Sequence, residues 1–174
     1  MGTLPARFTS TFAALTYRTI VGRSPVSFSL MLNLVSAANA HSKEILWGFL
    51  SRYIPGADPQ SQPMLDRLAG YALHYYEDFV LPAKKFRPAT DKERAAFADL
   101  VARLKALPAG CTDGEAIQNE VYEAGKAAGF EPLRSWFQAL YEVLLGQSQA
   151  PRFGSFAAIY GLGNTIDLIE KALA

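Results

Sequence analysis

The sequence is poor in the residues that form disulfides and metal sites. It has one cysteine, Cys111, which excludes an internal disulfide framework and is typical of a protein in a reducing compartment. Its two histidines are His41 and His74. His74 and Asp78 would lie one turn apart on a helix, but two ligands are too few for a metal site. We therefore expect a cytoplasmic protein with no internal disulfide and no bound metal.

Long apolar runs and an excess of charge of one sign are also absent. No stretch of about 18 apolar residues occurs, so we expect no membrane span and no membrane partner. The chain has 17 Lys and Arg residues against 16 Asp and Glu residues, which gives a net charge of +1. A strongly basic nucleic-acid-binding protein would look different. We therefore expect no DNA partner, and any RNA contact has to rest on a local basic patch.

The beginning of the chain lacks acidic residues, because the first one is Glu44. Met1–Arg23 is rich in Ser and Thr and contains three arginines, a composition found in organellar transit peptides. The same composition also fits coding sequence that does not belong to the domain. We expect residues 24–174 to form one domain and residues 1–23 to be an unmatched tail.

Apolar residues recur at helical spacing through nearly all of the remaining chain, and no segment of any length alternates with period two. The pattern predicts an all-α fold of about eight helices joined by short loops. Caps and breaks set the expected boundaries. The first expected helix begins at Pro25 after a Ser24 cap, the second runs from Lys43 to about Tyr53, and the third runs from Pro63 to Val80 with Met64, Tyr71, Tyr75 and Phe79 on its apolar face. The fourth runs from a Thr90–Glu93 capping box to about Leu107, and the fifth from a Thr112–Glu115 capping box to about Ala128. The last three run from Pro132 to Gly146, from Phe156 to Tyr160, and onward from a cap at Asn164 or Thr165.

A polar loop at 147–155 connects two of the expected helices and offers the groups that bind unpaired RNA bases. Such bases are bound by stacking on aromatic rings or arginine planes and by hydrogen bonds to their edges. The loop contains an arginine, a phenylalanine and several amide or hydroxyl side chains, and a tryptophan precedes it on the entering helix. The candidate RNA-contacting residues are Trp136, Gln147, Arg152, Phe153 and Ser155.

A second candidate is the basic loop that contains Lys84, Lys85 and Arg87, whose side chains could contact phosphates. The same cluster is equally compatible with an ordinary solvated loop. Trp136 and Phe153 could equally be core residues. On these residues alone, a helical module that binds another protein is the alternative to RNA binding.

Several blocks of the sequence resemble one family. The run Ala139–Gln147, followed by Pro151–Phe156, resembles the carboxy-terminal signature of class I lysyl-tRNA synthetases. The resemblance extends in order from about Ser24 to the end. The other similar blocks are Pro25–Phe28 with Leu32–Ala38, Ile45–Phe49, Asp78–Val80 with Lys84–Arg87, and Gln118–Gly125.

The resemblance implies an α-helical anticodon-binding domain, similar to the one in glutamyl-tRNA synthetases, with tRNA(Lys) and a catalytic domain as partners. The HIGH-like and KMSKS-like motifs of the catalytic half are not found in this sequence. We therefore expect the chain to be inactive alone and to hold no cofactor, since ATP and lysine would bind the catalytic half. Arg152 is the first expected contact to the anticodon. The family usually has Gly where this chain has Ala150, which would strain the loop if that position needs a positive φ.

Overall fold

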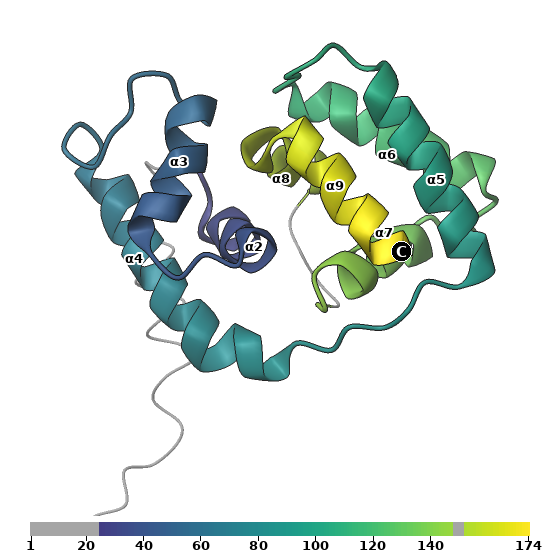
Figure 1. The fold of residues 1–174 in the computed structure, drawn as a ribbon, viewed down its shortest axis with the longest axis horizontal. Helices are drawn as coiled ribbons and strands as arrows, with labels where there is room; N and C mark the ends of the chain where they lie inside the picture. The colour runs from purple at the N-terminus through teal and green to yellow at the C-terminus, as the bar shows by residue number, and fades with distance from the viewer. Residues whose placement is uncertain (1–24, 148–151) are drawn as a thin grey trace, which may run out of the picture.

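The computed structural model describes residues 25–147 and 152–174 (Figure 1). Within these ranges the chain forms eight α-helices and no strand, which confirms the expected all-α fold. The predicted tail, residues 1–23, lies outside the described residues. No helix in the described part is long and apolar enough to cross a membrane. The helices are α2 (Phe28–Ala38), α3 (Lys43–Tyr53), α4 (Pro63–Tyr75), α5 (Asp91–Ala106), α6 (Gly114–Ala127), α7 (Arg134–Leu144), α8 (Phe153–Tyr160) and α9 (Leu162–Leu173).

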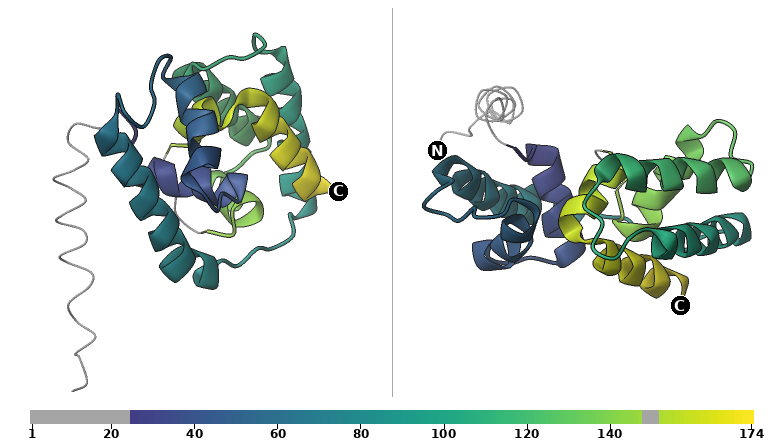
Figure 2. Two further views of the ribbon diagram at one scale, coloured as in Figure 1. Left: turned by 60° about the vertical axis from the view of Figure 1, so that its left-hand side comes forward. Right: turned by 90° about the horizontal axis from the view of Figure 1, so that it is seen from above.

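The helices form two groups that share α8. Figures 1 and 2 show α2, α3 and α4 on one side of the molecule and α5, α6 and α7 on the other. α8 lies between them and packs on α6, α2, α3 and α9. An extended segment, residues 84–90, crosses from the end of the first group to α5 (Figure 1). Short α8 is therefore the buried connection between the two groups.

The composition of α8 explains its central place. Phe153, Phe156 and Ala157 are at most 1% exposed, as expected for a helix that is apolar on nearly every face. Gly154 lets the helix approach α6 closely, and its N–H donates to Oε1 of the buried Gln118 at 2.7 Å. An amide side chain of α6 thus satisfies a backbone donor in the first turn of α8, where no intrahelical acceptor exists.

Two features of the helix boundaries are confirmed. α3 has the predicted bounds, Lys43–Tyr53, and Ser42 precedes it. α5 begins with the predicted capping box, in which Thr90 Oγ1 accepts from the Glu93 N–H and the Glu93 carboxylate accepts from the Thr90 N–H.

Other predicted helix starts are wrong by a few residues. α2 begins at Phe28, because Ser27 rather than Ser24 supplies the cap and accepts from the Leu30 N–H at 3.2 Å. α6 is capped by Asp113, one residue after the predicted Thr112. A carboxylate is a good cap because it accepts from the free N–H groups and because its negative charge is stabilised by the positive end of the helix dipole.

The last two helices also begin earlier than predicted. α8 begins at Phe153, so the predicted loop residues Phe153, Gly154 and Ser155 form its first turn. α9 follows Gly161 directly, without a side-chain cap from Asn164 or Thr165. Both side chains instead donate to carbonyls one turn earlier, of Tyr160 and Gly161. These hydrogen bonds are of the back-bonding type that polar residues make within helices.

The predicted third helix is α-helical only to Tyr75. A π-helical turn, η1 (Tyr76–Val80), and a 3-10 turn, η2 (Leu81–Ala83), follow it. Pro82 has no N–H and its ring clashes with the preceding turn of an α-helix, which explains why α4 changes its winding before it ends. The expected burial of this apolar face is wrong at its outer positions, since Met64, Tyr71 and Phe79 are 41%, 46% and 57% exposed.

Candidate nucleic-acid interface

The end of α7 fixes the basic loop that the sequence analysis identified. Gly146 follows α7 with φ +65°, and its carbonyl accepts from the Lys85 N–H at 2.9 Å. A Cβ atom at this position would lie 3.1 Å from the ring of Phe86. Glycine is therefore favoured here both by the left-handed backbone and by the close approach of the loop. The contact brings the basic loop beside Gln147.

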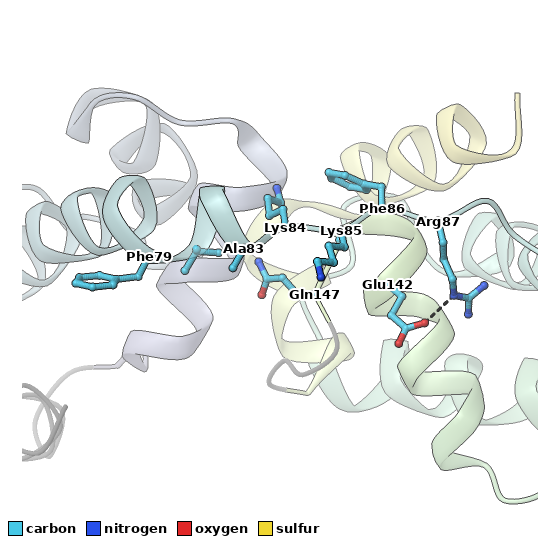
Figure 3. A pocket seen from close by; sticks show the side chains of 10 residues that line it. Phe79, Ala83, Lys84, Lys85, Phe86, Arg87, Glu142 and Gln147 are labelled. Atoms are coloured by element: carbon cyan, nitrogen blue, oxygen red, sulfur yellow. Dashed lines mark hydrogen bonds and ion pairs between the residues drawn. The ribbon is translucent and has the colours of Figure 1, made fainter. Parts of the chain in front are cut away.

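Four residues that were predicted to contact RNA meet at one open hollow of about 630 Å³ (Figure 3). The hollow lies where the end of η1, the basic loop and the end of α7 come together. Its lining therefore combines two lysines, an arginine paired with a carboxylate, an amide and two aromatic rings. The labelled side chains are Phe79, Ala83, Lys84, Lys85, Phe86, Arg87, Glu142 and Gln147.

The two lysines are the cations of this hollow that remain available to an anion. Lys84 Nζ donates to Tyr76 Oη at 3.2 Å and lies over the rings of Tyr76 and Phe86, 5.3 and 5.0 Å from their centroids, and Lys85 is exposed. Among the described residues, no carboxylate lies within ion-pair distance of either lysine. A phosphate that approached the hollow would meet two positive charges with little competition.

Arg87 is held by two carboxylates, those of Glu93 and Glu142. Its Nη1 and Nη2 each lie 2.8 Å from an oxygen of Glu93, and its Nε lies 2.6 Å from Glu142. These contacts raise the pKa of Arg87 and lower that of Glu93 to about 2. Arg87 thus joins the basic loop to α5 and α7, because its fork matches the Glu93 carboxylate and Glu142 accepts from Nε. Its phosphate contact stays a prediction.

Trp136 and Phe153 are core residues in this structure. Trp136 is fully buried, and its indole N–H donates to the Val121 carbonyl at 2.9 Å. Phe153 is 1% exposed. Neither ring has a face that a base could reach, so their expected role as RNA contacts is corrected to one of support. The physical reason is that the apolar stripe of α7 and the first turn of α8 both face the interior.

Arg152 remains accessible. It is the N-terminal flanking residue of α8, its side chain is 48% exposed, and it forms a bidentate ion pair with Glu115 in the first turn of α6, with 2.9 Å between Nη2 and Oε2. Exposed pairs of this kind contribute little to stability, so the guanidinium can exchange the carboxylate for a phosphate. Ser155 is half-buried in the same helical turn.

The predicted RNA-contacting residues thus do not all lie at the hollow. Gln147 lines the hollow, where its side-chain N–H donates to Ser36 Oγ at 3.2 Å, whereas Arg152 and Ser155 are not among the lining residues. Residues 148–151, with Ala150, lie outside the described part of the chain. Within that part, no three His, Cys, Asp or Glu side chains gather in a way that could hold a metal ion.

The sequence pattern does not predict the two exposed rings of the hollow. Phe79 is 57% exposed and Phe86 is 62% exposed. Its helical spacing predicts Phe79 on the apolar face of a regular helix and does not predict the π turn. For Phe86 the available signal was its position between Lys85 and Arg87, since an aromatic residue inside a basic, proline-bounded loop has little chance of reaching a core.

Comparison with known proteins finds relatives named lysine–tRNA ligase. The chain is 51% identical over 149 residues to a lysine–tRNA ligase of Roseobacter denitrificans, and this match covers 86% of the chain and 28% of that protein. It is 45% identical to a lysine–tRNA ligase of Rickettsia bellii and 40% identical to one of Rickettsia felis, each over 148 residues, 85% of the chain and 28% of the relative.

The chain therefore spans about 28% of the length of these relatives. It is homologous to one part of proteins named lysine–tRNA ligase, consistent with a lysyl-tRNA synthetase domain. No protein-family profile matches the chain. No solved structure matches it either.

Proposed function

We propose that this chain is the carboxy-terminal anticodon-binding domain of a class I lysyl-tRNA synthetase and that it binds the anticodon loop of tRNA(Lys) in the cytoplasm. The observation that carries the proposal is the 51% identity to a lysine–tRNA ligase over 86% of the chain. The all-α fold and the hollow with two available lysines support it. The chemistry that joins lysine to tRNA with ATP would belong to the part of the relatives that the match does not cover.

The proposed mechanism is recognition. Lys84 and Lys85 bind phosphates and thereby hold the loop in place without reading its sequence. Arg152 and Gln147 carry groups that hydrogen-bond to base edges or phosphates. Bases of the loop leave their stack when they are read, and the docked tRNA then directs its acceptor end toward the catalytic part of the enzyme.

The lysines can be tested by titration of the chain with a tRNA(Lys) anticodon stem-loop at two salt concentrations. We expect the double variant Lys84→Gln/Lys85→Gln to bind more weakly and to reduce the slope of log K against log [salt] by about 1 to 2, because each phosphate contact releases a counterion. The matched control is Lys171→Gln, which changes an exposed lysine in the last turn of α9.

An equal salt slope in the wild type and the double variant would remove the hollow from the RNA interface. No measurable binding by the wild type would contradict the proposed function. The rival function, a helical module for a protein partner, rests on the exposed Phe79 and Phe86. It predicts no affinity for the stem-loop at either salt concentration.

A further inference from the structure

We infer that the hollow between η1, the basic loop and the end of α7 is a stacking site for unpaired nucleotides, in which Phe79 and Phe86 provide the ring faces. The inference rests on the proposed function in one respect, namely that the chain binds RNA. It assigns base stacking to two residues other than Trp136 and Phe153. In this site Lys84 and Lys85 bind the phosphates of the nucleotides whose bases stack on the rings.

The exposure of the two rings is the first step. Large aromatic side chains are usually buried, and a single exposed one needs no explanation. Here two rings, 57% and 62% exposed, line the same hollow. In the view of Figure 3, Phe79 lies at one end of the row of lining side chains with its ring directed outward, Phe86 lies near Lys84 and Lys85, and Arg87 and Glu142 lie at the other end.

Both rings are held in position by their surroundings. Phe79 belongs to the π turn, and its ring lies 5.0 Å from that of Tyr75 at an angle of 38°. Phe86 lies against Gly146, where even a methyl group would be 3.1 Å from the ring. Preorganised rings lose little conformational entropy on binding, which is an advantage for a recognition surface.

The charges favour a nucleotide over an apolar protein segment. Lys84 Nζ lies over the Phe86 ring, 5.0 Å from its centroid. A base that stacks on this face has to displace the ammonium group, which stays close enough to contact the phosphate of the same nucleotide. Binding of an apolar helix would bury two lysines without a carboxylate partner, which is costly. Nucleic acids supply a phosphate for each base, and surfaces that bind single strands combine aromatic platforms with cations in this way.

The strand has to be unpaired at this site. In a duplex the faces of the bases are covered by their neighbours, and side chains cannot stack on them. An anticodon loop or another single-stranded segment presents free faces. The side-chain carbonyl of Gln147, which lines the hollow, can also accept from the edge of a base that stacks nearby, while its N–H donates to Ser36 Oγ.

The test compares Phe79→Ala and Phe86→Ala with the wild type in titrations against the tRNA(Lys) anticodon stem-loop and against a blunt RNA duplex of equal length. We expect each variant to bind the stem-loop about 5- to 100-fold more weakly, which is the usual cost of losing one base–aromatic stack. Duplex binding should not change. Phe79→Tyr and Phe86→Tyr should restore most of the stem-loop affinity.

The matched control is Leu81→Ala, because Leu81 is 51% exposed in the adjoining 3-10 turn but does not line the hollow. It should bind as the wild type does. Thermal unfolding of each variant verifies that the exposed substitutions leave the fold intact.

The outcomes separate the inference from the proposed function. If the alanine variants bind the stem-loop as tightly as the wild type while Lys84→Gln/Lys85→Gln weakens binding, the stacking site is wrong and the proposed function stands. An equal loss for the stem-loop and the duplex also overturns stacking. If the wild type binds no stem-loop, both fail.

Discussion

Gly154→Ala is expected to destabilise the chain by about 3 kcal/mol or more, at the upper end of the cost of overpacking a core. A Cβ atom on Gly154 would lie 2.1 Å from the carbonyl oxygen of Gly114 and 2.8 Å from the backbone nitrogen of Gln118. Both are backbone atoms of α6, so the strain can be relieved only if α6 and α8 move apart. That movement would also break the buried hydrogen bond from the Gly154 N–H to Gln118.

The size of this effect can be measured by urea unfolding followed by circular dichroism. The matched control is Gly48→Ala in α3, where an added Cβ would meet nothing within 4 Å. Alanine is the better helix former, so this control should leave stability unchanged or raise it by up to about 1 kcal/mol. Equal unfolding midpoints for Gly154→Ala and the wild type would contradict the close crossing of α6 and α8.

Arg87→Gln has the second largest expected effect, a loss of about 2 to 3 kcal/mol of unfolding free energy at neutral pH. The substitution leaves Glu93, whose side chain is 9% exposed, without its bidentate partner, and removes the ion pair to Glu142. The Thr90 N–H still donates to Glu93 in the variant, but a largely buried carboxylate without a cationic partner is destabilising. The control is Lys105→Gln, since the Lys105–Glu170 pair is 57% and 47% exposed and should contribute less than about 1 kcal/mol.

The same variant should change the dependence of stability on pH. Arg87 lowers the pKa of Glu93 from an ordinary value of 4.5 to about 2 in the folded chain. The unfolded state therefore takes up a proton first, and the stabilisation, complete above about pH 5, is lost as the pH falls toward 2. Urea unfolding between pH 6 and 2.5 should show a shallower decline for Arg87→Gln than for the wild type. Parallel declines would contradict this account of the ion-pair network.

The local patterns of the sequence predicted most helices because those patterns do not depend on distant contacts. The Thr90–Glu93 capping box and the bounds of α3 are examples. The predictions failed where neighbouring residues compete for one role. Ser24 and Ser27 can both cap α2, and the choice depends on which register buries the apolar residues that follow.

The candidate site was less predictable, because helical spacing does not tell which aromatic residue reaches the core. Trp136 is fully buried, whereas Phe79 is 57% exposed, although both occupy apolar stripes in the sequence. The π turn that holds Phe79 reflects tertiary packing and Pro82 together. The pairing of Arg87 with Glu142, which are 55 positions apart, has no local signal at all.

We propose that this chain reads the anticodon of tRNA(Lys). The most direct measurement is the ratio of dissociation constants for the tRNA(Lys) anticodon stem-loop and for the same stem-loop with its three anticodon bases replaced, at one salt concentration. We predict at least about tenfold tighter binding of the lysine anticodon, since each correctly read base contributes about 1 to 3 kcal/mol. Arg152→Ala should reduce this preference, whereas Glu115→Gln, which frees the Arg152 guanidinium, should not. Equal affinity of the wild type for the two stem-loops would contradict the claim.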